Sequence, residues 1–169
     1  MTESILIADD ESSIRESLTM VLRDEGYHCT AVSNGGEAIE ALGNERYTII
    51  ITDLKMPGID GMGVLEHALQ YSSDTLTIII TAHATVETAI HALRKGAADY
   101  ILKPLDFEEV LIRIENLLEH KKTIQENKHL REQIDQEYNF NHIIGESDAM
   151  KGVYKMIERV SGAHSNVLI

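Results

Sequence analysis

Five short runs of apolar residues, rich in β-branched side chains, recur along the first two thirds of the chain. Some are apolar at nearly every position, as in Thr77-Ile78-Ile79-Ile80. Such runs are typical of strands that are buried on both faces of a parallel sheet. We therefore predict five strands, at Ile5–Ala8, His28–Val32, Thr48–Thr52, Leu76–Thr81 and Asp99–Leu102.

The stretches between these runs carry apolar residues at helical spacing, so strands and helices alternate along the chain. Five such alternations predict an α/β fold, a doubly wound five-stranded parallel sheet, over residues 1–120. We expect the first helix to begin with a capping box formed by Ser13 and Glu16. Gly26, Gly43 and Gly96 stand where a helix should stop before the next strand.

After this domain the sequence predicts one long helix, because residues from Asp106 to about Glu137 include no Gly or Pro. Beyond Glu119 its apolar positions thin out into an imperfect heptad, with Asn127 as a polar residue at the seam. We expect residues 106–140 to form a signalling helix that pairs as a dimeric coiled coil, with a solvated spacer as the alternative. The apolar positions of this linker are Ile124, Leu130, Ile134 and Tyr138.

The final segment has a different pattern again. Residues 148–160 place apolar side chains on one helical face, and Asn166–Ile169 begins an apolar run typical of a strand. A single strand has no stability without neighbours, so residues 141–169 are expected to be the N-terminal fragment of a second α/β domain.

Composition narrows the class of protein. The 169 residues carry a net charge of −13 and include one cysteine, Cys29, which excludes an internal disulfide and a Cys-only zinc site. The acidic balance argues against direct contact with nucleic acid, because phosphates would be repelled. No apolar run is long enough for a membrane span, and the N-terminus lacks the pattern of a signal peptide. We expect a cytoplasmic protein that has no contact with a membrane.

Polar residues that carry chemistry follow the predicted strands. Asp9 and Asp10 come after the first strand and Asp53 after the third. Carboxylates that converge at one sheet edge repel one another unless a cation joins them, and Mg²⁺ prefers such oxygen ligands. A carboxylate at such a site can attack phosphorus, with Thr81 and Lys103 placed to contact phosphoryl oxygens. The pattern predicts a Mg²⁺-dependent phosphoryl site.

These motifs resemble the receiver domain of two-component response regulators over roughly residues 3–120. The resemblance rests on Asp9-Asp10, the stretch from Asp53 to Gly61, Thr81-Ala82 and Lys103-Pro104. It implies a flavodoxin-like fold and a signalling phosphoacceptor rather than an enzyme. A histidine kinase would be the phosphoryl donor.

The resemblance also implies a role for each site residue. Asp53 would be the phosphoacceptor, Asp10 the main Mg²⁺ ligand, and Asp9 a ligand through water. Lys55 and His83 lie two residues beyond the phosphoacceptor and the switch threonine, where side chains would affect phosphoryl lifetime. The remaining roles are a metal-binding carbonyl at Lys55, a switch hydroxyl at Thr81, a switch aromatic ring at Tyr100, a phosphate-pairing ammonium at Lys103 and a cis Lys103–Pro104 bond.

The tail shows a second resemblance. The stretch from Ile144 to Met150, with Val160 and Val167–Ile169, is similar to the entry of the AAA+ ATPase domain of sigma-54-dependent, nitrogen-regulator-type transcription activators. The Walker A loop of that domain is not in this sequence. The resemblance implies a homodimer formed through the receiver surface and the linker helix. Sigma-54 RNA polymerase and DNA would then be contacted only through domains that this chain does not contain.

Two other functions compete with this interpretation. A stand-alone receiver would act only by binding another protein. A phosphohydrolase of the haloacid-dehalogenase type would also combine three carboxylates with Mg²⁺ on an α/β sheet. That family places its nucleophile in a D-x-D arrangement at the first strand, whereas Ala8-Asp9-Asp10-Glu11 has none.

Overall fold

The chain divides into two compact units, Met1–His120 and Lys121–Ile169. A computed structural model describes residues 3–72, 74–82, 85–137 and 147–161. The predicted strand from Asn166 to Ile169 lies outside these residues.

The first unit is built on a five-stranded parallel sheet, as predicted. Its strand order, β2-β1-β3-β4-β5, is the flavodoxin-like doubly wound order. The strands start and end within one residue of the predicted positions. They are β1 (Ser4–Ala8), β2 (His28–Val32), β3 (Ile49–Asp53), β4 (Leu76–Thr81) and β5 (Asp99–Leu102).

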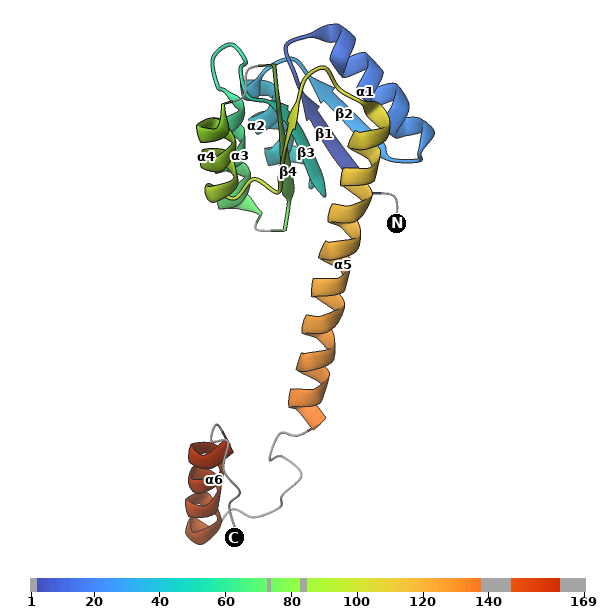
Figure 1. Cartoon of the computed structure of the whole chain (residues 1–169). Helices are drawn as coiled ribbons and strands as arrows, with labels where there is room; N and C mark the ends of the chain where they lie inside the picture. The colour runs from blue at the N-terminus through green and yellow to red at the C-terminus, as the bar shows by residue number, and fades with distance from the viewer. Residues whose placement is uncertain (1–2, 73, 83–84, 138–146, 162–169) are drawn as a thin grey trace. The chain divides into compact units, whose positions relative to one another are not determined.

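Helices cover both faces of this sheet (Figure 1). Side chains from α1 and α5 pack on one face, and those from α2, α3 and α4 on the other. This arrangement leaves the carboxyl ends of the strands uncovered at one edge. The helices are α1 (Ser12–Asp24), α2 (Gly35–Asn44), α3 (Gly61–Tyr71), α4 (Val86–Arg94), α5 (Phe107–Glu137) and, in the second unit, α6 (Asp148–Ser161).

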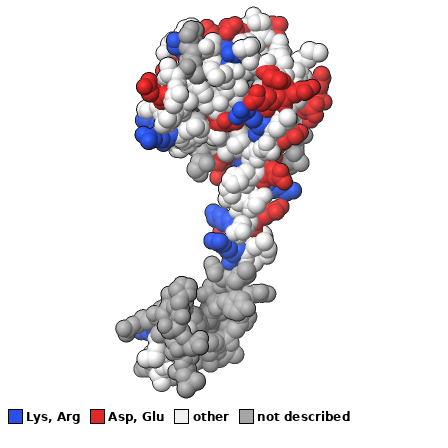
Figure 2. Space-filling view, in the orientation of Figure 1, with Lys and Arg blue, Asp and Glu red and all other residues white. Residues whose placement is uncertain are grey.

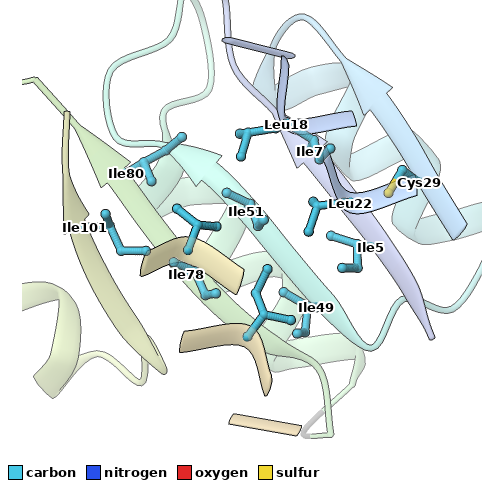
Figure 3. Close-up of a cluster of buried hydrophobic side chains, with 12 residues drawn as sticks. Ile5, Ile7, Leu18, Leu22, Cys29, Ile49, Ile51, Ile78, Ile80 and Ile101 are labelled. Carbon is cyan, nitrogen blue, oxygen red and sulfur yellow. The ribbon is translucent and has the colours of Figure 1, made fainter. Parts of the chain in front are cut away.

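Alternate residues of each strand enter different clusters, which is why the strand sequences are apolar almost throughout. Ile5 and Ile7 pack beneath α1 and α5, whereas Leu6 and Ala8 join the cluster beneath α2 and α3. Figure 3 shows the larger cluster, in which side chains from β1, β3, β4 and β5 meet those of α1. The core thereby fixes the register of the strands whose ends carry the polar residues.

The predicted capping box at Ser13 and Glu16 is wrong. The residue that precedes α1 is Glu11, which makes no side-chain capping hydrogen bond in the described chain, and Ser13 lies inside the helix. The helix starts early because it follows the turn after β1 almost directly. A capping box does occur at α4, where Thr85 and Thr88 exchange hydrogen bonds.

Of the three glycines that were predicted to end a helix, two do so. Gly26 and Gly96 have φ of 88° and 105°, conformations that glycine adopts without strain. Gly43 is different, because α2 continues through Asn44 and ends on Glu45 with φ −138°. An extended residue at that end removes the need for a left-handed glycine.

The long helix is confirmed as α5, and its apolar side chains fall into two groups. Val110 and Ile114 are buried against the sheet. Ile124 and Leu130 are each 56% exposed in the described chain. The side chain of Ile134 lies outside the described residues, so the heptad is described only in part. None of the described helices is both long and apolar enough to cross a membrane.

Candidate functional site

The strand ends bring the predicted site residues together at one edge of the sheet. Asp53 is the last residue of β3 and Thr81 the last of β4. Asp9 directly follows β1, and Lys103 directly follows β5. In the order β2-β1-β3-β4-β5 the winding reverses between β1 and β3, the place where ligands bind in doubly wound sheets.

Three carboxylates form an acidic cluster at this edge. One ligand oxygen from each of Asp9, Asp10 and Asp53 lies within 4.8 Å of the other two. Asp9 is fully buried and Asp53 is 5% exposed, whereas Asp10 is exposed. Burial raises the pKa of Asp9, although hydrogen bonds from Glu11 and Lys103 counteract part of this effect.

Lys103 places its ammonium group between these carboxylates. Its Nζ lies 2.5 Å from Oδ2 of Asp53 and 3.0 Å from Oδ2 of Asp9. Burial alone lowers the pKa of Lys103, but hydrogen bonds to Asp53, Glu11 and Asp9 outweigh it and raise the pKa above its usual value. The lysine therefore remains charged and offsets part of the negative charge of the cluster.

The loop after β3 holds the Asp53 carboxylate in place. The backbone N–H of Lys55 donates to Oδ1 of Asp53 at 2.9 Å, and the N–H of Leu54 donates to the Ile80 carbonyl at 2.8 Å. The N–H of Gly61 donates to the Leu54 carbonyl at 3.1 Å. This loop thus presents Oδ2 of Asp53 to the cluster while Oδ1 is hydrogen-bonded to the backbone.

The donor set fits a hard divalent cation. Oδ2 of Asp9 is buried and pairs with the Lys103 ammonium at 3.0 Å. One ammonium group offsets only part of the charge of three neighbouring carboxylates, so a further cation would stabilise the cluster. Carboxylate oxygens are the ligands that Mg²⁺ prefers.

The remaining predicted residues lie around this cluster. Thr81 is buried at the end of the neighbouring strand. The ring of Tyr100 is half-buried, and its hydroxyl lies 3.2 Å from Oγ1 of Thr88 on α4. The Lys103–Pro104 bond is cis, as the resemblance implied. Lys55 is exposed, and His83 lies outside the described residues.

Glu11 is a site residue that the sequence did not indicate. Its Oε1 accepts a hydrogen bond from Nζ of Lys103 at 2.9 Å. The two residues are 92 positions apart in the sequence, so no local pattern could pair them. The only signal was a third acidic residue directly after Asp9 and Asp10.

A family comparison agrees with this geometry. The sequence profile of the response regulator receiver domain matches residues 5–115. The chain belongs to the response regulator receiver family. The receiver domain therefore covers the sheet, the acidic cluster and the first part of α5.

Curated relatives extend the similarity to almost the entire chain. The DNA-binding transcriptional regulator NtrC of Escherichia coli K12 is 34% identical over 165 residues, 98% of this chain and 34% of that protein. The regulatory protein AtoC of the same organism is 31% identical over 165 residues, covering 98% of this chain and 36% of AtoC. The chain thus spans about a third of the length of the curated relatives it matches.

Among solved structures, some match the receiver part of this chain and others match nearly all of it. A CheY-like receiver domain from Methanospirillum hungatei has a TM-score of 0.70 and 29% identity, over 73% of this chain and 98% of its own. The structure of NtrX from Brucella abortus has a TM-score of 0.74 and 29% identity, over 98% of this chain and 36% of its own. The receiver fold is shared with both.

Proposed function

We propose that this chain accepts a phosphoryl group on Asp53 from a histidine kinase in a Mg²⁺-dependent reaction. In this step an oxygen of the Asp53 carboxylate forms a bond to phosphorus while the bond from phosphorus to the kinase imidazole nitrogen breaks. The leaving imidazole keeps the electron pair and takes up a proton. The product is an acyl phosphate on Asp53.

The other residues of the site would bind Mg²⁺ or contact the phosphoryl oxygens. Asp10, Asp9, Asp53 and the backbone carbonyl of Lys55 would hold Mg²⁺, which supplies positive charge to the phosphoryl oxygens when bound. The Lys103 ammonium, now paired with Asp53, would pair with a phosphoryl oxygen after transfer. The Thr81 hydroxyl would donate to another phosphoryl oxygen. The ring of Tyr100 would then change its position as Thr81 moves.

The observation that carries this proposal is the position of the Asp53 carboxylate. It lies within the acidic cluster and in hydrogen-bond contact with the Lys103 ammonium. A buried carboxylate with a neighbouring cation site and a charged lysine is suited to attack phosphorus, because the negative charge of the donor is offset.

Replacement of Asp53 tests the assignment directly. Acetyl phosphate with Mg²⁺ should add one phosphoryl group to the chain, and a beryllofluoride complex should bind the same site. Asp53→Asn should abolish both, since the amide is a poor nucleophile and loses a metal-binding charge. The control Asp74→Asn, at an exposed position, should behave like the unchanged chain, as measured by intact mass. Stoichiometric labelling of the Asp53→Asn chain excludes the assignment.

The same preparations separate this function from the phosphohydrolase alternative. A phosphoacceptor is modified once per chain, whereas a haloacid-dehalogenase-like enzyme releases phosphate from a generic phosphate ester over many turnovers. Sustained phosphate release that depends on Asp53 would favour the enzyme. A single round of labelling supports the phosphoacceptor.

We further propose that phosphorylation controls a sigma-54 activator ATPase in a longer protein. The names of NtrC and AtoC describe a DNA-binding transcriptional regulator and a regulatory protein, and this chain is similar to about a third of each. In this proposal residues 106–140 form a dimeric signalling helix and residues 141–169 begin the AAA+ domain. Contacts with sigma-54 RNA polymerase and DNA would belong to the parts that follow.

A further inference from the structure

A side chain on α1 contacts the turn that carries two of the proposed Mg²⁺ ligands. Nη1 of Arg15 donates to the backbone carbonyl of Asp9 at 2.6 Å. Arg15 lies in the first turns of α1, and its side chain is partly buried. It belongs to none of the motifs that predicted the site.

The carbonyl that Arg15 contacts has a special position. It belongs to the peptide group that joins Asp9 to Asp10, so its orientation affects the relative directions of both side chains. Other contacts also hold Asp9. Its side chain accepts from the N–H of Glu11 at 2.9 Å and lies 3.0 Å from the Lys103 ammonium, and its own N–H donates to the Val32 carbonyl at 3.3 Å. None of these contacts fixes the direction of the Asp9 carbonyl.

Asp10 depends on this peptide group more than Asp9 does. Asp9 is fully buried, so packing restricts its side chain, whereas Asp10 is exposed and packing restricts it little. A hydrogen bond from a charged guanidinium is stronger than one between neutral groups, so it is suited to fix the peptide plane.

We propose that Arg15 is a positioning residue that orients the Asp9–Asp10 peptide group for Mg²⁺ binding. This inference rests on the proposed Mg²⁺-dependent function of the site. Residues that orient metal ligands without touching the metal typically change metal affinity by about 10- to 100-fold when they are replaced. For one peptide group we expect the lower end, a loss of about tenfold.

Arg23 provides a matched control on the same helix. Its Nη2 donates to the backbone carbonyl of Cys29 at 3.0 Å, which is the same kind of bond, but to a residue of β2. Both arginines line one surface pocket. Replacing either one removes the same charge and one guanidinium–carbonyl bond, but only Arg15 contacts the turn with the carboxylates.

The experiment measures Mg²⁺ binding to the chain by titration calorimetry, together with the Mg²⁺ dependence of labelling by acetyl phosphate. Arg15→Met should weaken Mg²⁺ binding about tenfold, and Arg23→Met should change it less than about twofold. At saturating Mg²⁺ the labelling rate of the Arg15→Met chain should return to that of the unchanged chain. Arg15→Lys keeps the charge but not the planar donor group, so its affinity should fall between the two.

Each other outcome overturns the inference in a distinguishable way. Equal weakening in both Met variants means that a general disturbance of α1 is responsible, because loss of a positive charge alone would strengthen cation binding. Unchanged affinity in the Arg15→Met chain removes Arg15 from the site. If Arg15→Met unfolds, Arg15→Lys decides, because wild-type affinity in that variant contradicts the role of the planar donor. Failure of the unchanged chain to bind Mg²⁺ overturns the proposed function and this inference together.

Discussion

At the scale of single residues, the two adjacent carboxylates have different environments. Asp9 is fully buried beside the Lys103 ammonium, while Asp10 is exposed at the rim of the cluster. The charge of Asp9 is therefore already offset by a lysine that forms part of the site. Asp10 brings a carboxylate that a metal ion can reach without displacing Lys103 from Asp9.

We predict that Asp10→Ala weakens Mg²⁺ binding more than Asp9→Ala does, by about a factor of ten between the two. Asp10→Ala would remove the proposed direct ligand. Asp9→Ala would remove the proposed ligand through water, and it would also leave the buried Lys103 ammonium with one carboxylate fewer and lower the stability. Metal titration of both variants, with their thermal unfolding recorded in parallel, checks the order. The reverse order of affinities would assign direct ligation to Asp9.

At the scale of elements, α3 begins so close to β3 that its first residue has no room for a side chain. A Cβ on Gly61 would lie 2.3 Å from the carbonyl oxygen of Asp53, a backbone atom that cannot move aside easily. The start of the helix therefore packs directly against the end of β3, where the proposed phosphoacceptor Asp53 lies. Gly43 in α2 shows the opposite case, since a Cβ there meets nothing within 4 Å.

These two glycines give a matched prediction of stability. Gly61→Ala should lower the free energy of unfolding by about 1–3 kcal/mol, because the backbone of β3 must shift. It should also slow labelling of Asp53. Gly43→Ala should raise the free energy of unfolding by about 0.5–1 kcal/mol, since alanine favours the helix interior. Urea denaturation measures the free energy of unfolding of both variants. If the two substitutions change it equally, the backbone near Gly61 accommodates a Cβ without cost and the prediction is wrong.

At the scale of the whole molecule, charge is divided unevenly along the chain. Residues 1–120 contain 8 Lys and Arg against 21 Asp and Glu, whereas residues 121–169 contain 7 of each. Figure 2 shows many acidic side chains on the visible face of the receiver domain, and side chains of both signs along α5. Two receiver domains therefore repel each other, and a neutral segment is the better place for self-association.

We predict a weak dimer that depends on the exposed apolar residues of the linker. Replacing Ile124 and Leu130 together with Gln should make the chain monomeric at about ten micromolar, because each buried apolar side chain contributes about 1.5–3 kcal/mol. Higher salt should strengthen the dimer by screening the receiver charges. Sedimentation measures both effects, with Met20→Gln, an exposed change on α1, as the control.

A monomer at that concentration in the unchanged chain would contradict the coiled-coil prediction. A dimer that persists after the Ile124 and Leu130 changes would place the interface elsewhere, such as on the receiver surface.

The sequence by itself determined the strands and the residues that meet at the candidate site. Strands buried on both faces need apolar residues at nearly every position, so the runs from Ile5 to Leu102 located all five strands. Because the carboxyl ends of parallel strands meet at one edge, the order of Asp9, Asp53, Thr81 and Lys103 along those strands was enough to predict that they converge.

Only the tertiary structure decided which atoms meet within that edge. The hydrogen bond from Lys103 to Glu11 links two distant parts of the sequence, and Gly61 is needed because α3 begins next to the Asp53 carbonyl; no local spacing encodes either feature. The start of α1 is another case, since the turn after β1 rather than Ser13 sets it. The physical reason is the same throughout: periodicity follows from burial of each element on its own, whereas hydrogen bonds and close contacts depend on how elements pack together.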